Sequence, residues 1–497
     1  MAIRPCVSQI LGVIVLALAG LAMALPAPAL AQNSTADERL REDRDRRDGL
    51  DDEDAEDEDE DREEDEERDR RSRTPDGEED AGAELDADRD IGERATELEP
   101  DSLLDDVLDG SLDAQAEPEI GPYDPLGIRI GSFLFFPEFE ADRQHTDNVF
   151  ASSTIRSSDW STRLRPAFEL RSNWSRHELA GNLEYEKIIY DDFSSEDEEN
   201  NAAGLRGRID IGRRSSLEAE TSYDSQTESR GDINVPSNVA QRPTEITKAA
   251  ALQLNHAFNR LSVTLRGEVT EEEFGDVTLA GGGTFDNAAR DNTQHELVGR
   301  LSYELIPGVA IFAEGSGNEI DLVRANANGF VLDSNGWSAL GGFSLDFGGT
   351  ITGDIAAGFA QQKPDNGALQ GVEGAILAAN VIWALSPLTN INFNAAFDIE
   401  TTTLANSIGS LVQTVGIEVE HAFRSNLVLT TGVSYELEDF ASANLEQETL
   451  GVLVEGEYRL NRSLGLVAGY EFTDFSSTIG ANDYQENLFL LGVRVRR

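Results

Sequence analysis

The chain is poor in the side chains on which many enzymes and metal sites depend. Its one cysteine, Cys6, lies near the start of the sequence, in a segment that we expect to be removed. The mature chain would then have no disulfide framework and no thiol chemistry. None of the five histidines has metal-ligand spacing to another; they are His145, His177, His256, His295 and His421. His145, near Asp147, is the one weak catalytic candidate. We therefore predict no enzyme activity, no metal and no cofactor.

Long hydrophobic runs are also missing. Outside the first 31 residues no stretch approaches 18 apolar residues, so the sequence predicts no helix that spans a membrane. No phosphate loop or dinucleotide motif follows a strand and opens a helix. Basic residues are few, with 40 Lys and Arg against 95 Asp and Glu and a net charge of -55. This balance argues against nucleic acid as a partner, because a phosphate backbone is bound by cations.

Residues 1–31 have the pattern of a secretory signal peptide. Arg4 provides the positive start, Ile10 to Leu25 form an apolar core, and Ala29-Leu30-Ala31 is a cleavage site. The sequence therefore predicts export across an inner membrane. An exported chain without helical spans is either soluble or an outer-membrane β-barrel.

Residues 32–122 form an acidic segment. Between Asp37 and Glu119 there are 40 acidic and 12 basic residues, with no aromatic residue, and nine of the ten positions from Asp51 to Glu60 are acidic. Such a stretch cannot bury enough apolar surface to offset its ordering entropy, so we predict a disordered periplasmic segment. It is either a solvated linker or a tail that binds divalent cations or a basic partner. Asp101 to Leu112 has helical spacing and could form a short amphipathic helix.

The rest of the chain alternates apolar and polar residues. The first strand is expected within Leu126 to Val149, and from Asp159 onward the sequence predicts strands long enough to cross a membrane, about 18 in all. Trp160 to Leu170, Leu217 to Tyr223 and Ile391 to Ile399 show the pattern clearly. In the last of these, Phe393, Phe397 and Ile399 share the face assigned to lipid.

Three features favour a membrane barrel over a soluble sandwich. Short links such as Asn259-Arg260 and Pro307-Gly308 alternate with long ones such as Gly275 to Asp291. The four tryptophans fall near predicted strand ends, where aromatic girdles meet lipid headgroups; they are Trp160, Trp174, Trp337 and Trp383. An even strand number places both ends of the domain at the short-turn side. We predict an all-β, transmembrane, antiparallel, up-and-down β-barrel over residues 123–497.

The inward positions carry almost all the charge of the predicted barrel. The expected lumen-lining residues are Glu138, Glu140, Arg163, Arg165, Glu184, Arg206, Arg208, Glu218, Glu418 and Glu455. If the first short turn is centred between Trp174 and Ser175 and the next loop on Ser195, Arg165 lies opposite Glu184 and Glu184 opposite Arg206. This ladder is either a salt-bridged wall that stiffens the barrel or a basic track for an anionic solute.

Several short motifs resemble a known family. They are Gly127-Ile128-Arg129-Ile130-Gly131-Ser132-Phe133, Thr146-Asp147-Asn148-Val149-Phe150, Leu164-Arg165-Pro166 and Asn173-Trp174-Ser175-Arg176-His177. The stretch from Tyr123 to Arg497 is similar to the putative outer-membrane β-barrel porin family 2, with its Asp-Asn-Val-Phe loop after the first strand. The resemblance implies a barrel like those encoded with surface-polysaccharide synthesis machinery.

We therefore expect a porin or channel in the cell outer membrane, with the acidic segment in the periplasm. Three functions stay open: an exit pore for a secreted surface polysaccharide, a general diffusion porin for small polar solutes, and a structural or adhesive barrel with a blocked lumen. The expected partners are outer-membrane lipid, a polar solute or polysaccharide, and a periplasmic protein of the export machinery.

Overall fold

A computed structural model describes residues 121–230, 239–325, 329, 332–367, 369–401, 408–440, 445–478 and 483–497. The predicted signal peptide and all but the last two residues of the predicted acidic segment lie outside these residues, as does the predicted helix at Asp101 to Leu112. Within the described part of the chain, no helix is long and apolar enough to cross a membrane.

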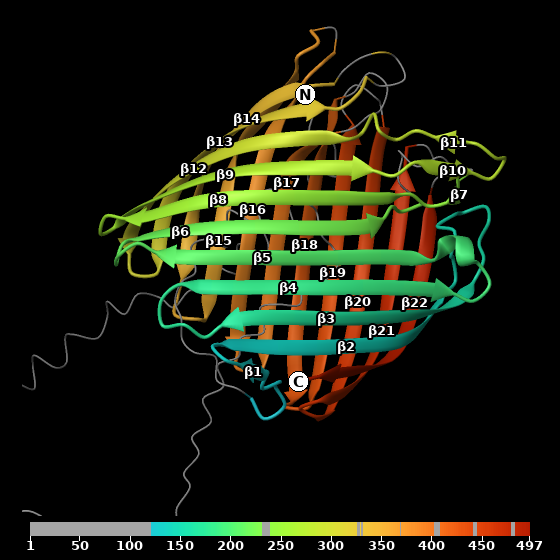
Figure 1. Cartoon of the computed structure of the whole chain (residues 1–497), viewed down its shortest axis with the longest axis horizontal. Helices are drawn as coiled ribbons and strands as arrows, with labels where there is room; N and C mark the ends of the chain where they lie inside the picture. Colours follow the sequence, from blue (N-terminus) through green and yellow to red (C-terminus); the bar gives the residue numbers. More distant parts are fainter. Residues whose placement is uncertain are drawn as a thin grey trace, which may run out of the picture. The chain divides into compact units, whose positions relative to one another are not determined.

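Eighteen long antiparallel strands form one closed barrel (Figure 1). The first, β2 (Phe133–Thr146), pairs with β3 (Asp159–Ser172) on one side and with the last, β22 (Tyr484–Arg496), on the other. Each remaining strand pairs with its neighbours in the sequence. These strands are β4 (Glu178–Tyr190), β5 (Glu198–Asp210), β6 (Ser215–Thr227), β8 (Thr244–Ala257), β9 (Leu261–Phe274), β12 (Asn292–Ile306), β13 (Val309–Leu322), β14 (Ser334–Asp346), β15 (Ile351–Pro364), β16 (Val372–Ser386), β17 (Thr389–Thr401), β18 (Gly409–Arg424), β19 (Leu427–Phe440), β20 (Leu445–Asn461) and β21 (Leu464–Ser477). The predicted all-β, up-and-down barrel is confirmed.

Short elements lie at the two ends of the barrel. β1 (Ile128–Ile130) folds back on the start of β2. A 3-10 turn, η2 (Ser194–Glu196), follows β4. A separate three-stranded sheet comes from two of the long loops and projects beyond the barrel in Figure 1; its strands are β7 (Val239–Gln241), β10 (Val277–Leu279) and β11 (Thr284–Phe285).

The connections alternate in length, as the sequence predicts. The longest of the eight short turns covers residues 173–177, whereas the loop from β9 to β12 covers residues 275–291. All short turns lie at one end of the barrel, because every strand reverses the direction of the one before it. We call this the short-turn end and the opposite end the long-loop end. The first and last barrel strands begin and finish at the short-turn end.

The outer face of the barrel is an apolar band. Leu183 on β4, Leu205 on β5 and Leu252 on β8 lie on this face with 51%, 49% and 54% of their surface exposed. Exposed leucine is unfavourable in water and favourable in lipid, so the band fits a membrane. Trp160 and Trp337 lie toward the ends of their strands on the same face, where the aromatic girdle was expected.

An arginine in the middle of the outer face should weaken the barrel. We expect Leu205→Arg to lower the free energy of unfolding by about 2–4 kcal/mol, because the guanidinium would face the lipid midplane. Ser222→Arg is the matched control, since Ser222 pairs with Gly204 next to Leu205, on the opposite, inner face. Urea unfolding in lipid vesicles measures both variants. Equal losses would show that the face assignment is wrong.

Candidate functional site

The densest cluster of buried charge lies where the barrel closes. Arg494 on β22 donates to Glu140 on β2, with 2.6 Å between Nε and Oε2, and Arg163 on β3 donates to the other oxygen of Glu140 at 2.9 Å. Glu140 is only 1% exposed. This one carboxylate therefore links the last strand to the first and the first to the second.

Further ion pairs extend this cluster on both sides. Arg163 also contacts Asp142 at 2.9 Å and Glu186 on β4 at 3.7 Å. Arg494 reaches Glu455 on β20 at 3.3 Å. We call the whole set the seam network: Glu138, Glu140, Asp142, Arg163, Glu186, Glu455, Glu457, Arg459, Arg494 and Arg496. It spans six neighbouring strands on the inner face.

The Asp-Asn-Val-Phe loop fastens the same closure at the long-loop end. The backbone and side-chain nitrogens of Asn487, on β22, donate to the two oxygens of Asp147, each at 2.9 Å. Asn148 Nδ2 donates to the carbonyl of Gln485 at 2.9 Å. Burial acts to raise the pKa of Asp147, but the hydrogen bonds from Asn487 and from Arg156 outweigh it and hold this pKa below its usual value. The motif thus ties the first long loop to the last strand.

The predicted charge ladder is partly wrong. Arg165 forms an ion pair with Glu184, but the two residues are not opposite each other, because Glu184 lies opposite Ala167 on β3. On the β5 side, Glu184 lies opposite Ala202, and Arg206 lies opposite Ala180, so Glu184 and Arg206 are not cross-strand partners. The first turn is centred one residue later than assumed, with His177 in the left-handed region at φ 67°, and the next loop is centred on Phe193.

Arg206 and Arg208 are paired elsewhere. Arg206 contacts Glu218 on β6 at 3.1 Å, and Arg208 contacts Asp210 on its own strand at 3.2 Å. Glu218 also accepts a hydrogen bond from Asn255 on β8 at 2.9 Å. The inner face of β5, β6 and β8 is therefore a wall of paired charges.

A different surface covers the inner face of β13 to β16. Its apolar cluster is Phe312, Leu340, Ala356, Ala360, Ile376 and Ala378, and we call it the apolar corner. Gly342 lies among these residues, and a Cβ there would come within 2.6 Å of the Phe312 ring, so only glycine lets β14 approach so closely. The predicted outward position of Ile399 is wrong, because Ile399 packs against this cluster.

Arg300 on β12 lies at the edge of the apolar corner. Its guanidinium lies 3.6 Å from the centre of the Phe312 ring and contacts Asp354, three strands away on β15, at 2.6 Å. A contact over that many strands is possible only on the concave face. Arg300 and the apolar corner were not among the predicted features, although the run of alanine and glycine from β14 to β16 indicates close packing.

The third inner surface is an acidic strip on β18 and β19, formed by Glu418, Glu436 and Glu438. Glu418 accepts a hydrogen bond from Asn392 on β17 at 3.3 Å, and Glu438 accepts one from Ser410 at 2.6 Å. The sequence from 372 to 440 holds a single basic residue, Arg424, which ends β18 at the turn. Glu418 and Glu438 therefore each lie beside a neutral hydrogen-bond donor, an amide and a hydroxyl.

The structure brings four of the predicted lining residues, Glu138, Glu140, Arg163 and Glu455, into one network through Arg494. It separates the other six into local pairs or into the acidic strip. Sequence reasoning missed Arg494, which alternates with Val493 and Val495 in the last strand. That the ten residues line an open lumen stays a prediction.

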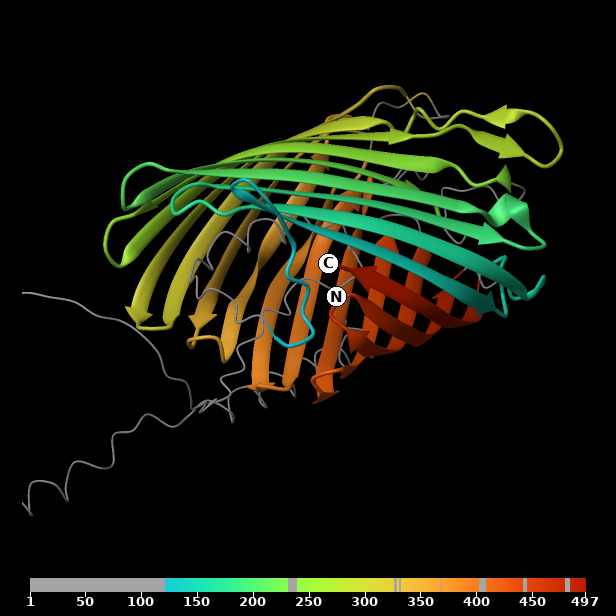
Figure 2. The same cartoon turned by 60° about the horizontal axis from the view of Figure 1, so that its bottom comes forward.

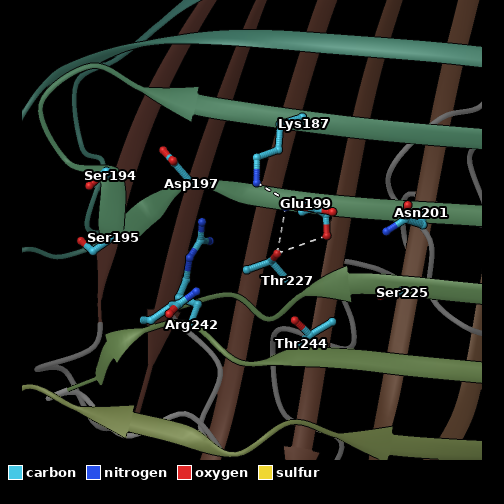
Figure 3. A pocket seen from close by; sticks show the side chains of 11 residues that line it. Lys187, Ser194, Ser195, Asp197, Glu199, Asn201, Ser225, Thr227, Arg242 and Thr244 are labelled. Atoms are coloured by element: carbon cyan, nitrogen blue, oxygen red, sulfur yellow. Dashed lines mark hydrogen bonds and ion pairs between the residues drawn. The ribbon is translucent and has the colours of Figure 1, made fainter. Parts of the chain in front are cut away.

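One polar pocket of about 350 Å³ lies away from the lumen, on the outer face near the long-loop end (Figure 3). Lys187 and Glu199 form an ion pair there at 3.0 Å, and Thr227 donates to the Glu199 carbonyl. Arg242 is held by Glu198 at 2.8 Å. Because these charges neutralise one another, we interpret the pocket as part of the packed rim of the barrel. Among the described residues, no group of His, Cys, Asp and Glu could hold a metal ion.

Comparisons with known proteins identify one matching family. The family model described as putative beta-barrel porin 2 matches residues 121–497. No curated protein matches the chain. The siderophore receptor PirA from Acinetobacter baumannii is 6% identical with a TM-score of 0.37, over 73% of this chain and 80% of that one.

Two further solved structures are similar to the same degree. The FrpB iron transporter from Neisseria meningitidis is 8% identical with a TM-score of 0.40, over 69% of this chain but only 61% of its own. OccAB4 from Acinetobacter baumannii is 11% identical with a TM-score of 0.38, over 73% of this chain and 98% of that one. These likenesses say nothing about a solute.

Removing the shared carboxylate of the seam should weaken the barrel strongly. We expect Glu140→Ala to lower the free energy of unfolding by about 3–5 kcal/mol, because two buried guanidinium groups lose a partner. Arg324→Ala removes an exposed ion pair with Asp286 and should cost less than about 1 kcal/mol. The urea concentration at half-unfolding measures both. A small loss for Glu140→Ala would mean that backbone pairing alone holds the closure.

Proposed function

Because the chain belongs to the putative beta-barrel porin 2 family, we propose that it forms an outer-membrane channel for small polar solutes, with a preference for cations. The long loops would then lie outside the cell and the short turns in the periplasm, as in other barrels of this kind. The acidic strip on β18 and β19 carries this proposal. Its carboxylates lie on the inner face of a stretch that holds one basic residue.

The charge at the long-loop end supports the same preference. The nine long connections contain 13 acidic and five basic residues. Rings and strips of carboxylates attract cations and raise their local concentration at a pore entrance. A cation would therefore meet negative charge first at the rim and again along the acidic strip.

The arginines of the inner face do not favour an anion path. Arg163 has three carboxylate partners and 11% of its side chain exposed. Arg206 and Arg300 are paired as well. A guanidinium that already has carboxylate partners offers little net attraction to a passing anion, so these residues act chiefly as a stiff wall.

Selectivity of the purified channel tests the proposal. In a KCl gradient we expect a reversal potential that favours potassium, and Glu418→Gln/Glu436→Gln should lower the cation-to-anion permeability ratio several-fold. Glu271→Gln/Glu273→Gln is the matched control, because this acidic pair lies on the outer face beside Lys248 and should change nothing. Anion preference would overturn the proposal. No conductance at all would indicate a barrel with a blocked lumen.

Export of a surface polysaccharide is the second candidate. The inner face of β17 to β19 offers amides and hydroxyls beside the carboxylates: Asn392 and Asn394 on β17, Thr414 on β18 and Ser434 on β19. Sugar hydroxyls form hydrogen bonds with such groups. The apolar corner argues for a smaller solute, because it occupies part of the inner face.

A strain that lacks this protein separates the two candidates. If the barrel exports polymer, polysaccharide should accumulate in the periplasm and disappear from the medium and cell surface, because its exit is lost. If the barrel is a diffusion channel, both fractions should stay unchanged while uptake of small polar solutes slows. Quantifying polymer in both fractions, with the gene restored as a control, decides between them.

A further inference from the structure

The connections at the two ends of the barrel carry opposite net charge. The eight short turns contain five arginines and no acidic residue. The long-loop end is acidic, as described above. This separation is not needed for strand pairing, because turn residues are largely interchangeable in charge. It gives the short-turn end a surface suited to an anionic partner.

The arginines of the short-turn end form an arc around much of its rim. Six of them are exposed, and together we call them the arginine arc: Arg129, Arg176, Arg213, Arg214, Arg260 and Arg424. Within the described ranges, none of the six forms an ion pair. The arc runs from the turn after β18, past β1, to the turn after β8. On the remaining side the rim carries Glu304 and Asp346 instead.

The chain enters the barrel within the span of this arc. Arg462, in the turn between β20 and β21, donates to the carbonyl of Pro122 at 2.8 Å, and Arg459 contacts Asp124 at 3.4 Å. Figure 2 shows this first described stretch leading to β1 and β2 at the short-turn end. The β20–β21 turn lies between the turn that follows β18 and the start of β2. The preceding residues therefore begin beside the arginines.

Those preceding residues are strongly acidic. Residues 84–119 hold 14 acidic and two basic residues, and Glu117 and Glu119 come just before Gly121. An extended chain spans about 3.3 Å per residue, so about 25 residues already reach about 80 Å. The segment is therefore long enough to contact every arginine of the arc.

We propose that residues 84–119 dock on the arginine arc. Each contact would be an exposed ion pair of small individual strength, but many act together because the segment is tethered. Screening then controls the docking. The Debye length falls from about 10 Å in 0.1 M salt to about 3 Å in 1 M salt, so high salt should release the segment. Docking does not require that the lumen conduct.

Distances between two spin labels test the proposal in the full-length protein. In a Cys6→Ser background, one label is placed at Ala87→Cys in the acidic segment and the other at Ser175→Cys in a short turn. We expect a population of short distances at low salt that disappears in 1 M NaCl. The control pair, Ala87→Cys with Ser153→Cys in the first long loop, should give no short distances at any salt concentration.

Charge variants show whether the arginines are responsible. Arg213→Gln/Arg214→Gln should reduce the short-distance population several-fold, whereas Arg156→Gln/Arg324→Gln at the long-loop end should leave it unchanged. Heat-modified migration on gels confirms that the variants are folded. Short distances that survive both 1 M NaCl and the arginine substitutions would overturn the proposal.

Anionic lipid headgroups are the competing occupant of the arginine arc. The same label pair is therefore measured in neutral detergent and in vesicles that contain phosphatidylglycerol. Equal short-distance populations support the acidic segment as the occupant. Short distances that are lost in the anionic vesicles would mean that lipid headgroups hold the arc in a membrane, and the proposal would fail.

Discussion

The barrel depends on one contact that is remote in sequence, the pairing of its first strand with its last. β2 and β22 share nine residue pairs, whereas β2 and β3 share 14. Every other strand pair joins strands that a turn or loop already holds near each other, but this pair must bring together the two ends of the domain. Side-chain interactions therefore have to add the stability that the shorter backbone ladder between β2 and β22 lacks. Glu140, between Arg163 and Arg494, does so in the middle of the wall, and Asp147 with Asn487 does so at the long-loop end.

The same interactions also fix the register of the closure. A slip of one residue would turn Arg494 toward lipid and bring Val495 to the inner face, because strand side chains alternate. A slip of two would separate Arg494 from Glu140. The seam network thus selects one alignment among several that the backbone alone would accept. The loop from Asp147 to Phe150 likewise has a structural role at the closure, because Asp147 and Asn148 bind Asn487 and Gln485 of β22.

The sequence was sufficient for the strands but not for their alignment. A membrane requires apolar residues outside and satisfied backbone groups within, so alternation and turn residues locate each strand. Register depends on the exact centre of each connection. The turn with the left-handed His177 and the loop with the 3-10 turn at Ser194 are centred on other residues than predicted. Glu184 therefore does not lie opposite its predicted partner, Arg206. The apolar corner was missed for a different reason. β17 leaves β16 after Ala396, so Ile399 turns inward although its parity assigns it to lipid.

Charge is unevenly distributed along the barrel axis as well as around the barrel wall. In a chain with a net charge of -55, five arginines gathered in eight short turns are a marked local excess. The acidic long-loop end and the acidic segment repel each other, whereas the short-turn end attracts that segment. Because the segment joins the barrel beside Arg459 and Arg462, attraction and tether act at the same end. Coulomb forces alone would therefore favour the short-turn end over the long-loop end as the place where an acidic chain meets this barrel.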